Sequence, residues 1–257
     1  MRVDYHAHVV AHGEHEYSRE RVERYIDQAY TMGIAEIGFC EHDEFQHMVD
    51  LELFRSIQSQ KSHGIEIRLG LELDYFPGRE EQLKQTILSA DFDFVIGSVH
   101  FIEGWGFDHP DFRDGFSQRE TDDVYSQYAA ILLRMSQWAG IDVVGHLDLV
   151  KIWGHRPRRL KALHYFEPVL KAVQRAGIAV EINSAGLRKD VQEIYPAGDI
   201  IQRMFDYDIP ITVGSDAHQP EQVGSGLEAA YRAARQAGYH YLVRFKRHQQ
   251  LVTPLDY

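Results

Sequence analysis

Histidine and carboxylate residues stand at the ends of successive apolar runs along the whole chain. The residues concerned are His6, His8, Glu41, His42, Glu72, His100, His146, Asp216 and His218. Apolar runs of this length are typical of strands that are buried on both faces of a parallel sheet. Because parallel strands all point the same way, these side chains would emerge at one end of the sheet. Imidazole and carboxylate gathered at one place is a metal-site composition.

The bulk composition limits the class of protein. The chain has 257 residues, enough for a substantial core, and we expect one domain over residues 1–257. No apolar stretch approaches the roughly 20 residues that cross a bilayer. The net charge of -12 argues against a general nucleic-acid or membrane-surface binder. The polar start and the single cysteine, Cys40, favour a cytoplasmic protein without disulfides.

Strand and helix signals alternate from end to end. The expected strands are Met1–Asp4, Ile34–Cys40, Ile65–Leu73, Phe94–Val99, Val143–Gly145, Ala179–Ile182 and Ile211–Val213, with Tyr241–Phe245 as an eighth strand or a tail element. The expected helices are Ser18–Met32, Thr121–Ala139, Leu160–Ala176 and Glu221–Ala237. A helix, a glycine and then a short apolar strand is the connection of a parallel sheet. About seven such units in one domain predict an α/β fold, a (β/α) barrel whose strand C-termini carry the chemistry.

Individual positions sharpen the metal hypothesis. Side chains two residues apart on a strand share a face, so one metal ion can bind both His6 and His8. Glu72 lies inside an apolar run, where an unpaired carboxylate is costly. A salt bridge would explain it, but we favour a carboxylate that bridges two metal ions, with Asp74 on the same strand face as the alternative. His47, in a helical context, is expected to be structural.

Basic residues and a long loop indicate a substrate pocket. Lys151, Arg156 and Arg188 follow strand ends, where they can overhang the site, and arginine suits bidentate phosphate binding. The segment 101–120 has no helix signal and combines aromatic with acidic residues. We expect this segment to form a pocket wall or a lid.

These motifs resemble the PHP (polymerase and histidinol phosphatase) superfamily, and within it the monofunctional histidinol-phosphate phosphatases. The general motifs occupy residues 6–8, 41–42, 70–72, 97–100, 145–148 and 214–218. Those closer to the phosphatase branch occupy residues 97–110, 181–189 and 193–196. The resemblance runs through the whole chain. It implies a distorted (β/α)7 barrel of the PHP type, with the metal site at the C-terminal ends of the strands.

The resemblance further implies a trinuclear site of two to three divalent transition metals, either zinc, iron or manganese. The first metal would be held by His6, His8, Glu72 and Asp216, the second by Glu72, His100 and His146, and the third by His42, His218 and a histidine of the first loop. The family usually places that histidine where this chain has Glu14. His15 is the next residue and precedes the helix cap Ser18, so we favour it, with His12 as the alternative.

What the resemblance implies for activity is hydrolysis of L-histidinol phosphate by a metal-bridging hydroxide, in histidine biosynthesis. The catalytic residues would be Glu72, Asp216 and Arg188, and the substrate-binding residues Arg156, Arg188, Lys151, Glu103 and Asp108. The expected partner is a small phosphate monoester, with no nucleic acid and no membrane. The alternatives are a phosphoesterase of nucleotides or other small esters, and a non-catalytic metal-binding protein.

Overall fold

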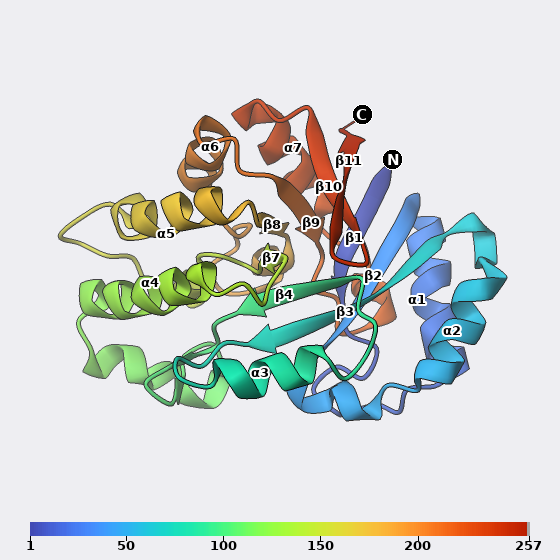
Figure 1. The fold of residues 1–257 in the computed structure, drawn as a ribbon. Helices are drawn as coiled ribbons and strands as arrows, with labels where there is room; N and C mark the ends of the chain where they lie inside the picture. Colours follow the sequence, from blue (N-terminus) through green and yellow to red (C-terminus); the bar gives the residue numbers. More distant parts are fainter. Residues whose placement is uncertain (256–257) are drawn as a thin grey trace.

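The computed structural model describes residues 1–255, and within them seven parallel strands form a distorted, nearly closed barrel (Figure 1). The strands follow one another around the barrel in chain order. They are β1 (Arg2–Ala7), β2 (Ile34–His42), β3 (Glu66–Asp74), β4 (Phe94–Ser98), β7 (Val143–Val144), β8 (Ala179–Asn183) and β9 (Ile211–Gly214). The first and last strands meet where His8 N donates to Ala217 O at 2.8 Å and Ala217 N to His6 O at 3.1 Å. The expected (β/α)7 barrel is thereby confirmed.

Helices cover the outside of the barrel (Figure 1). They are α1 (Arg19–Thr31), α2 (Leu51–Gln60), α3 (Glu80–Ile87), α4 (Thr121–Gln137), α5 (Ala162–Ala176), α6 (Gly198–Asp206) and α7 (Leu227–Ala237). The Ser18 hydroxyl caps α1 by accepting from Arg21 N at 3.3 Å. The start expected for α7 was wrong, because a 3-10 turn at Pro220–Gln222 and left-handed Gly224 and Gly226 precede it. The sequence signals did not reveal α2, α3 or α6.

The final apolar run is a tail element, not an eighth barrel strand. It forms β10 (Tyr241–Lys246), which pairs antiparallel with β11 (Gln249–Pro254). Phe245 N donates to the Tyr5 hydroxyl at 2.8 Å, which ties this hairpin to the barrel. Beside it the buried Glu36 accepts from Arg68 Nε at 2.9 Å and also from Arg244 of β10. The hairpin therefore closes the N-terminal end of the barrel with a paired charge cluster.

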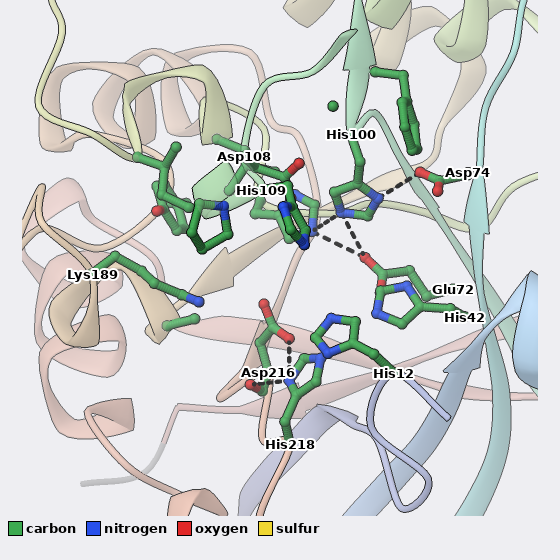
Figure 2. A pocket seen from close by; sticks show the side chains of 18 of the residues that line it. His12, His42, Glu72, Asp74, His100, Asp108, His109, Lys189, Asp216 and His218 are labelled. Atoms are coloured by element: carbon green, nitrogen blue, oxygen red, sulfur yellow. Dashed lines mark hydrogen bonds and ion pairs between the residues drawn. The ribbon is translucent and has the colours of Figure 1, made fainter. Parts of the chain in front are cut away.

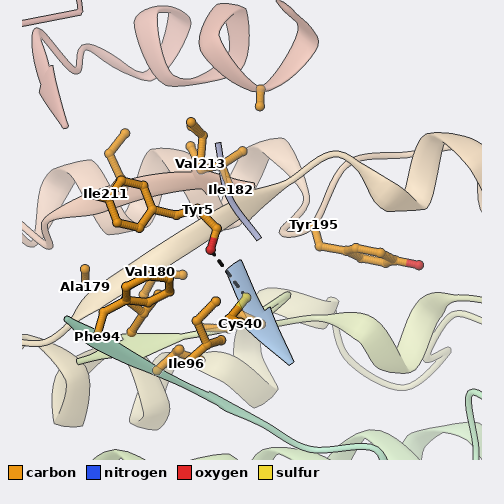
Figure 3. Close-up of a cluster of buried hydrophobic side chains, with 14 of the residues drawn as sticks. Tyr5, Cys40, Phe94, Ile96, Ala179, Val180, Ile182, Tyr195, Ile211 and Val213 are labelled. Atoms are coloured by element: carbon orange, nitrogen blue, oxygen red, sulfur yellow. Dashed lines mark hydrogen bonds between the residues drawn. The ribbon is translucent and has the colours of Figure 1, made fainter. Parts of the chain in front are cut away.

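Large apolar side chains fill the barrel interior above that hairpin (Figure 3). The Phe94 ring lies 4.9 Å from the ring centroid of Tyr5. A Cβ on Gly38 or Gly70 would approach Phe94 to 2.6 or 2.3 Å, so glycine on β2 and β3 makes room for this ring. The result is a solid apolar floor. Polar side chains at the C-terminal ends of the strands rest on it.

The segment 101–120 has structure of its own. It contains the short hairpin β5 (Phe101–Ile102) and β6 (Trp105–Gly106), followed by 3-10 turns over Pro110–Gln118. Trp105 Nε1 donates to Phe112 O at 2.9 Å, which holds the hairpin and the turns together.

None of the helices within residues 1–255 has the length and apolar character needed to span a bilayer.

Candidate metal centre

The expected ligands converge at one end of the barrel, around a cavity of about 700 Å³ (Figure 2). They come from β1, β2, β3 and the segments that directly follow β1, β4, β7 and β9. The structure brings together His6, His8, His42, Glu72, His100, His146, Asp216 and His218. Parallel pairing places His42 of β2 directly beside Glu72 of β3. Barrel register, rather than nearness in sequence, therefore assembles the group.

The carboxylate of Glu72 lies at the centre of the group and is 1 % exposed. Its Oε2 lies 3.2 Å from His6 Nε2, 3.4 Å from His8 Nε2 and 3.1 Å from His42 Nδ1. Its Oε1 lies 3.0 Å from His146 Nε2 and 3.7 Å from a nitrogen of the His100 ring. The two oxygens thus face two different sets of imidazoles. That is the arrangement of a carboxylate able to bridge two cations.

Asp216 lies on the other side of the first histidine pair. Its Oδ1 is 3.5 Å from His8 Nε2 and 3.8 Å from His6 Nε2, and it is also 3.5 Å from His218 Nδ1. The backbone of Asp216 adopts a left-handed φ of 54°, which non-glycine residues rarely occupy. Strain of this kind gathers at functional sites. Here it turns the carboxylate toward the histidines while Ala217 pairs with β1.

The ring nitrogens at this site are largely unsatisfied, which tests whether metal ions fit. Within residues 1–255, the buried histidine ring nitrogens without a hydrogen-bond partner are His6 Nε2, His8 Nδ1 and Nε2, His42 Nε2, His146 Nδ1 and His218 Nε2. Buried polar atoms without partners are rare and costly. Three sets could each hold an ion: His8, His42 and His218; His42, Glu72 and His100; and His6, His8 and Cys40. The donor set fits divalent transition metals, which imidazole and carboxylate bind well.

The charge states at the site suit metal binding. Burial alone would raise the pKa of Glu72, but the charges of His6 and His42 outweigh it and hold that pKa well below its ordinary value. The pKa of Asp216 is likewise held down, against burial, chiefly by His6. Burial lowers the pKa of His42 well below its usual range and that of His218 to about 3. For the carboxylates of Glu72 and Asp216 and for the imidazoles of His42 and His218, these directions favour the ionised and the neutral form respectively, which are the forms that coordinate metals.

Two acidic residues orient the histidines from behind. Glu181 Oε1 lies 2.8 Å from His6 Nδ1, and its Oε2 accepts from His146 N at 3.0 Å. Asp74 on β3, the expected alternative to Glu72 as a metal ligand, instead forms a hydrogen bond with His100 Nδ1 and supports that ring. Against burial, these carboxylates raise the pKa values of His6 and His100. Such supports fix which ring nitrogen faces the site. Glu181 was not among the site residues expected from the sequence, although it begins one of the phosphatase-like motifs.

The first loop places His12, rather than the favoured His15, at the site. The His12 ring stacks 4.5 Å from the His218 ring and 5.3 Å from the His42 ring. His15 lies outside the cavity lining, where its Nε2 accepts from Gln219 Nε2 at 3.2 Å. The loop turns back early because Ala11 and Gly13 adopt left-handed φ values of 54° and 77°. The expectation for His15 is therefore corrected in favour of His12.

Two of the expected substrate-binding residues line the cavity. Arg188 Nη2 donates to the backbone oxygens of Ser215 at 2.7 Å and Asp216 at 3.0 Å. Its Nη1 is buried and has no partner in the described chain. Asp108 lines the cavity from the hairpin segment, and burial raises its pKa. Lys189, to which the sequence analysis gave no role, lines the cavity as well (Figure 2).

The other three expected substrate-binding residues do not line the cavity. Lys151 is 2 % exposed, and its Nζ is bound by Asp148 Oδ2 and Ile194 O, both at 2.8 Å. The Arg156 guanidinium pairs with Glu193 Oε1 at 2.8 Å. Glu103 is exposed at the turn between β5 and β6. These expectations are corrected, because Asp148, three residues before Lys151, and Glu193, from another loop, pair with the two basic groups, and Glu103 is exposed outside the cavity lining.

Comparison with known proteins agrees with this geometry. The model of the PHP domain family matches residues 4–185, and a PHP-associated model matches residues 204–228. A probable histidinol-phosphatase of Deinococcus radiodurans is 33% identical over 228 residues, which cover 83% of this chain and 86% of that protein. The histidinol-phosphatase of Lactococcus lactis is 27% identical over 260 residues, covering 95% and 94%.

A solved structure has the same fold. It is the histidinol phosphate phosphatase of Lactococcus lactis complexed with zinc, L-histidinol and phosphate. The TM-score is 0.80 at 24% identity, and the match covers 97% of this chain and 98% of that one.

Glu72→Gln should remove bound metal, because the substitution keeps the shape but removes the charge shared by two sets of imidazoles. We expect wild-type protein purified without chelator to carry about two to three transition-metal ions per chain. The variant should carry at least about one ion fewer per chain. Elemental analysis measures this. The control is His47→Ala, which changes an exposed ring and should leave the metal content unchanged. Full metal content in Glu72→Gln would contradict the bridging geometry.

His12→Ala should lower metal content and activity far more than His15→Ala, because only the His12 ring reaches the other imidazoles. A lost ligand or ligand support typically costs about 10- to 100-fold in metal affinity. Competition with a fluorescent chelator measures this affinity for both variants. If His15→Ala proved the more damaging, the conformation of the first loop described above would be wrong.

Proposed function

Because the chain belongs to the PHP domain family, we propose that it is a metal-dependent phosphatase that hydrolyses L-histidinol phosphate to L-histidinol and phosphate. The observation that carries the proposal is the position of Glu72, whose carboxylate lies between two groups of imidazoles at the floor of the cavity. The same cavity is lined by Arg188, whose Nη1 has no hydrogen-bond partner among the described residues. The relatives support the substrate, since those described above are histidinol-phosphatases that match most of the chain.

We assign the ligands of the metals as the resemblance to the PHP family implies, with His12 in place of His15 because the His12 ring stacks against those of His42 and His218. The first ion would be held by His6, His8, Glu72 and Asp216, the second by Glu72, His100 and His146, and the third by His12, His42 and His218. When bound, divalent cations would neutralise phosphate oxygens and make hydroxide available near neutral pH. Zinc, iron and manganese all suit these donors. Two to three ions are the proposed content.

Arg188 is the proposed grip on the phosphate. Two backbone carbonyls fix its Nη2 side, so the guanidinium plane is held in place before substrate arrives. Its free Nη1 then offers a charge-assisted hydrogen bond to a phosphate oxygen. Fixing the donor in advance avoids the entropy cost of ordering a long side chain on binding. Lys189 adds positive charge to the same wall of the cavity.

The organic part of the substrate would face the hairpin segment. Histidinol phosphate carries an amine and an imidazole, which need an acceptor and an aromatic or polar surface. Asp108 offers a half-buried carboxylate, and Phe101 and Phe112 contribute aromatic rings to the cavity wall. We propose that Asp108 receives the amine and that the two rings bound the imidazole, while the segment shields the reacting phosphate from bulk water.

Two further proposals concern the whole chain. One core cluster extends from Val3 to Leu255, which supports a single domain over residues 1–257. Cys40 is a buried free thiol, which fits the reducing conditions of the cytoplasm.

Phosphate release from a small panel of esters tests the function. We expect the metal-loaded protein to hydrolyse histidinol phosphate with a kcat/KM at least about 100-fold above that for p-nitrophenyl phosphate or a nucleoside monophosphate, because several cavity groups would bind the organic part. A nucleotide that is the better substrate would favour a nucleotide phosphoesterase. Absence of activity with every ester would favour a non-catalytic metal-binding protein.

Arg188→Ala should lower kcat/KM for histidinol phosphate by about 30- to 1,000-fold, the effect of losing one charge-assisted contact of about 2 to 4 kcal/mol in a water-poor site. Steady-state kinetics with the metal content measured in parallel check this. Arg156→Ala is the matched control, because that arginine pairs with Glu193 outside the cavity lining. Equal losses in the two variants would contradict a phosphate contact by Arg188.

A further inference from the structure

The phosphatase-like motif at residues 193–196 contains Tyr195, to which neither the metal centre nor the proposed phosphate grip assigns a role. The chain returns here to the end of β8. Tyr195 N donates to Asn183 O at 2.8 Å, and Asn183 N donates to Tyr195 O at 2.6 Å. This antiparallel bridge fixes the backbone of Tyr195 beside the strand ends that carry the metal ligands. The side chain of Tyr195 lines the cavity.

The ring of Tyr195 is held firmly in place. It stands 6.4 Å from the His146 ring at an interplanar angle of 76°, and Lys151 Nζ lies 5.4 Å from its centroid. A Cβ on Gly186 would lie 2.9 Å from the ring atoms Cε2 and Cζ, so a glycine leaves the space that the ring occupies. In Figure 3 the hydroxyl points away from the labelled apolar side chains. The packing around the ring therefore fixes the position of the hydroxyl group.

The hydroxyl of Tyr195 has no hydrogen-bond partner in the described part of the chain, and the residue is 1 % exposed. Neither protein nor bulk water satisfies it. Two other buried tyrosines are paired, since Tyr25 donates to His8 O at 2.7 Å and Tyr239 to Ile209 O at 2.9 Å. The Tyr128 hydroxyl also lacks a partner in the described residues, but Tyr128 does not line the cavity. A buried hydroxyl without a partner is costly, so a bound group in the cavity is its natural acceptor.

Arg188 shares both properties, since it lines the cavity and its Nη1 is buried without a partner among residues 1–255. Both residues follow β8 and line the same cavity. A guanidinium N–H and a phenol O–H are both donors at neutral pH. Two unsatisfied donors at one cavity, one of them cationic, call for an anion with several acceptor oxygens.

We propose that the Tyr195 hydroxyl donates a hydrogen bond to a phosphoryl oxygen of the bound ester, in the same cavity as Arg188. The inference deepens the proposed phosphatase function and rests on it for the identity of the ester. The Tyr195 contact is neutral and fixed by the ring, whereas Arg188 supplies charge. A rigid donor costs no reorganisation when charge shifts onto the phosphoryl oxygens.

Tyr195→Phe tests this, because it removes the hydroxyl and keeps the ring against His146 and Gly186. In the metal-loaded protein, we expect the Kd for inorganic phosphate, measured by calorimetry, to rise about 5- to 10-fold. We expect kcat/KM for histidinol phosphate to fall about 10- to 100-fold. Metal content should not change. Tyr128→Phe is the matched control, because the Tyr128 hydroxyl is also buried without a partner in the described residues but does not line the cavity.

The two readouts separate this inference from the proposed function. Unchanged phosphate affinity and unchanged kcat/KM in Tyr195→Phe would overturn the inference and leave the phosphatase function standing. Loss of metal with unchanged phosphate affinity at full metal loading would also overturn it, because Tyr195 would then act only as a support of His146. A third outcome is also possible: Tyr195→Phe binds phosphate more weakly, but the wild-type protein does not hydrolyse histidinol phosphate. That result would support the phosphate contact and overturn the proposed substrate.

Discussion

A carboxylate buried among imidazoles is stable only where positive charge lies beside it, and Glu72 is in that position. It has almost no exposure, and its two oxygens face different histidines, with His6, His8 and His42 on one side and His100 and His146 on the other. Without compensation such burial costs several kcal/mol. The rings of His6, His8, His42 and His146 each have a buried nitrogen without a hydrogen-bond partner among the described residues, which is also unfavourable. Divalent cations between carboxylate and rings would resolve both at once.

The barrel can tolerate this polar centre because its interior is divided into an apolar, closed N-terminal part and a polar C-terminal end. The N-terminal end is closed by the β10–β11 hairpin and by the cluster of Glu36, Arg68 and Arg244, in which each charge has a partner. Above it, Phe94 fills the space left by glycines on β2 and β3. At the C-terminal end, several buried ring nitrogens have no hydrogen-bond partner among the described residues, and His42, Glu72, His100, His146, Asp216 and His218 line the cavity. Stability and chemistry thus occupy opposite ends of the same strands, as is usual in such barrels.

The sequence predicted the barrel and the convergence of ligands because both follow from repeated local signals, an apolar run ending in histidine or carboxylate. It could not predict contacts that depend on conformation or on distant partners. His15 was favoured over His12 because the left-handed backbone at Ala11 leaves no signature in sequence. Lys151 and Arg156 were expected to bind phosphate because their positions after strand ends do not show which acidic groups pair with them. Lys151 pairs with the nearby Asp148, and both basic groups contact Glu193 from another loop. Tertiary pairing, not residue type, decided those roles.

We propose that the carboxylate of Glu72 lies between two metal ions and contacts both. The most direct test is a crystal structure of the metal-loaded protein, with anomalous difference maps recorded at the absorption edge of the bound metal. The account predicts a peak on each side of Glu72, one within about 2.0 to 2.2 Å of each carboxylate oxygen if the metal is zinc. One peak should lie toward His6 and His8 and the other toward His100 and His146. A single peak, or peaks that leave Glu72 without a metal contact, would contradict it.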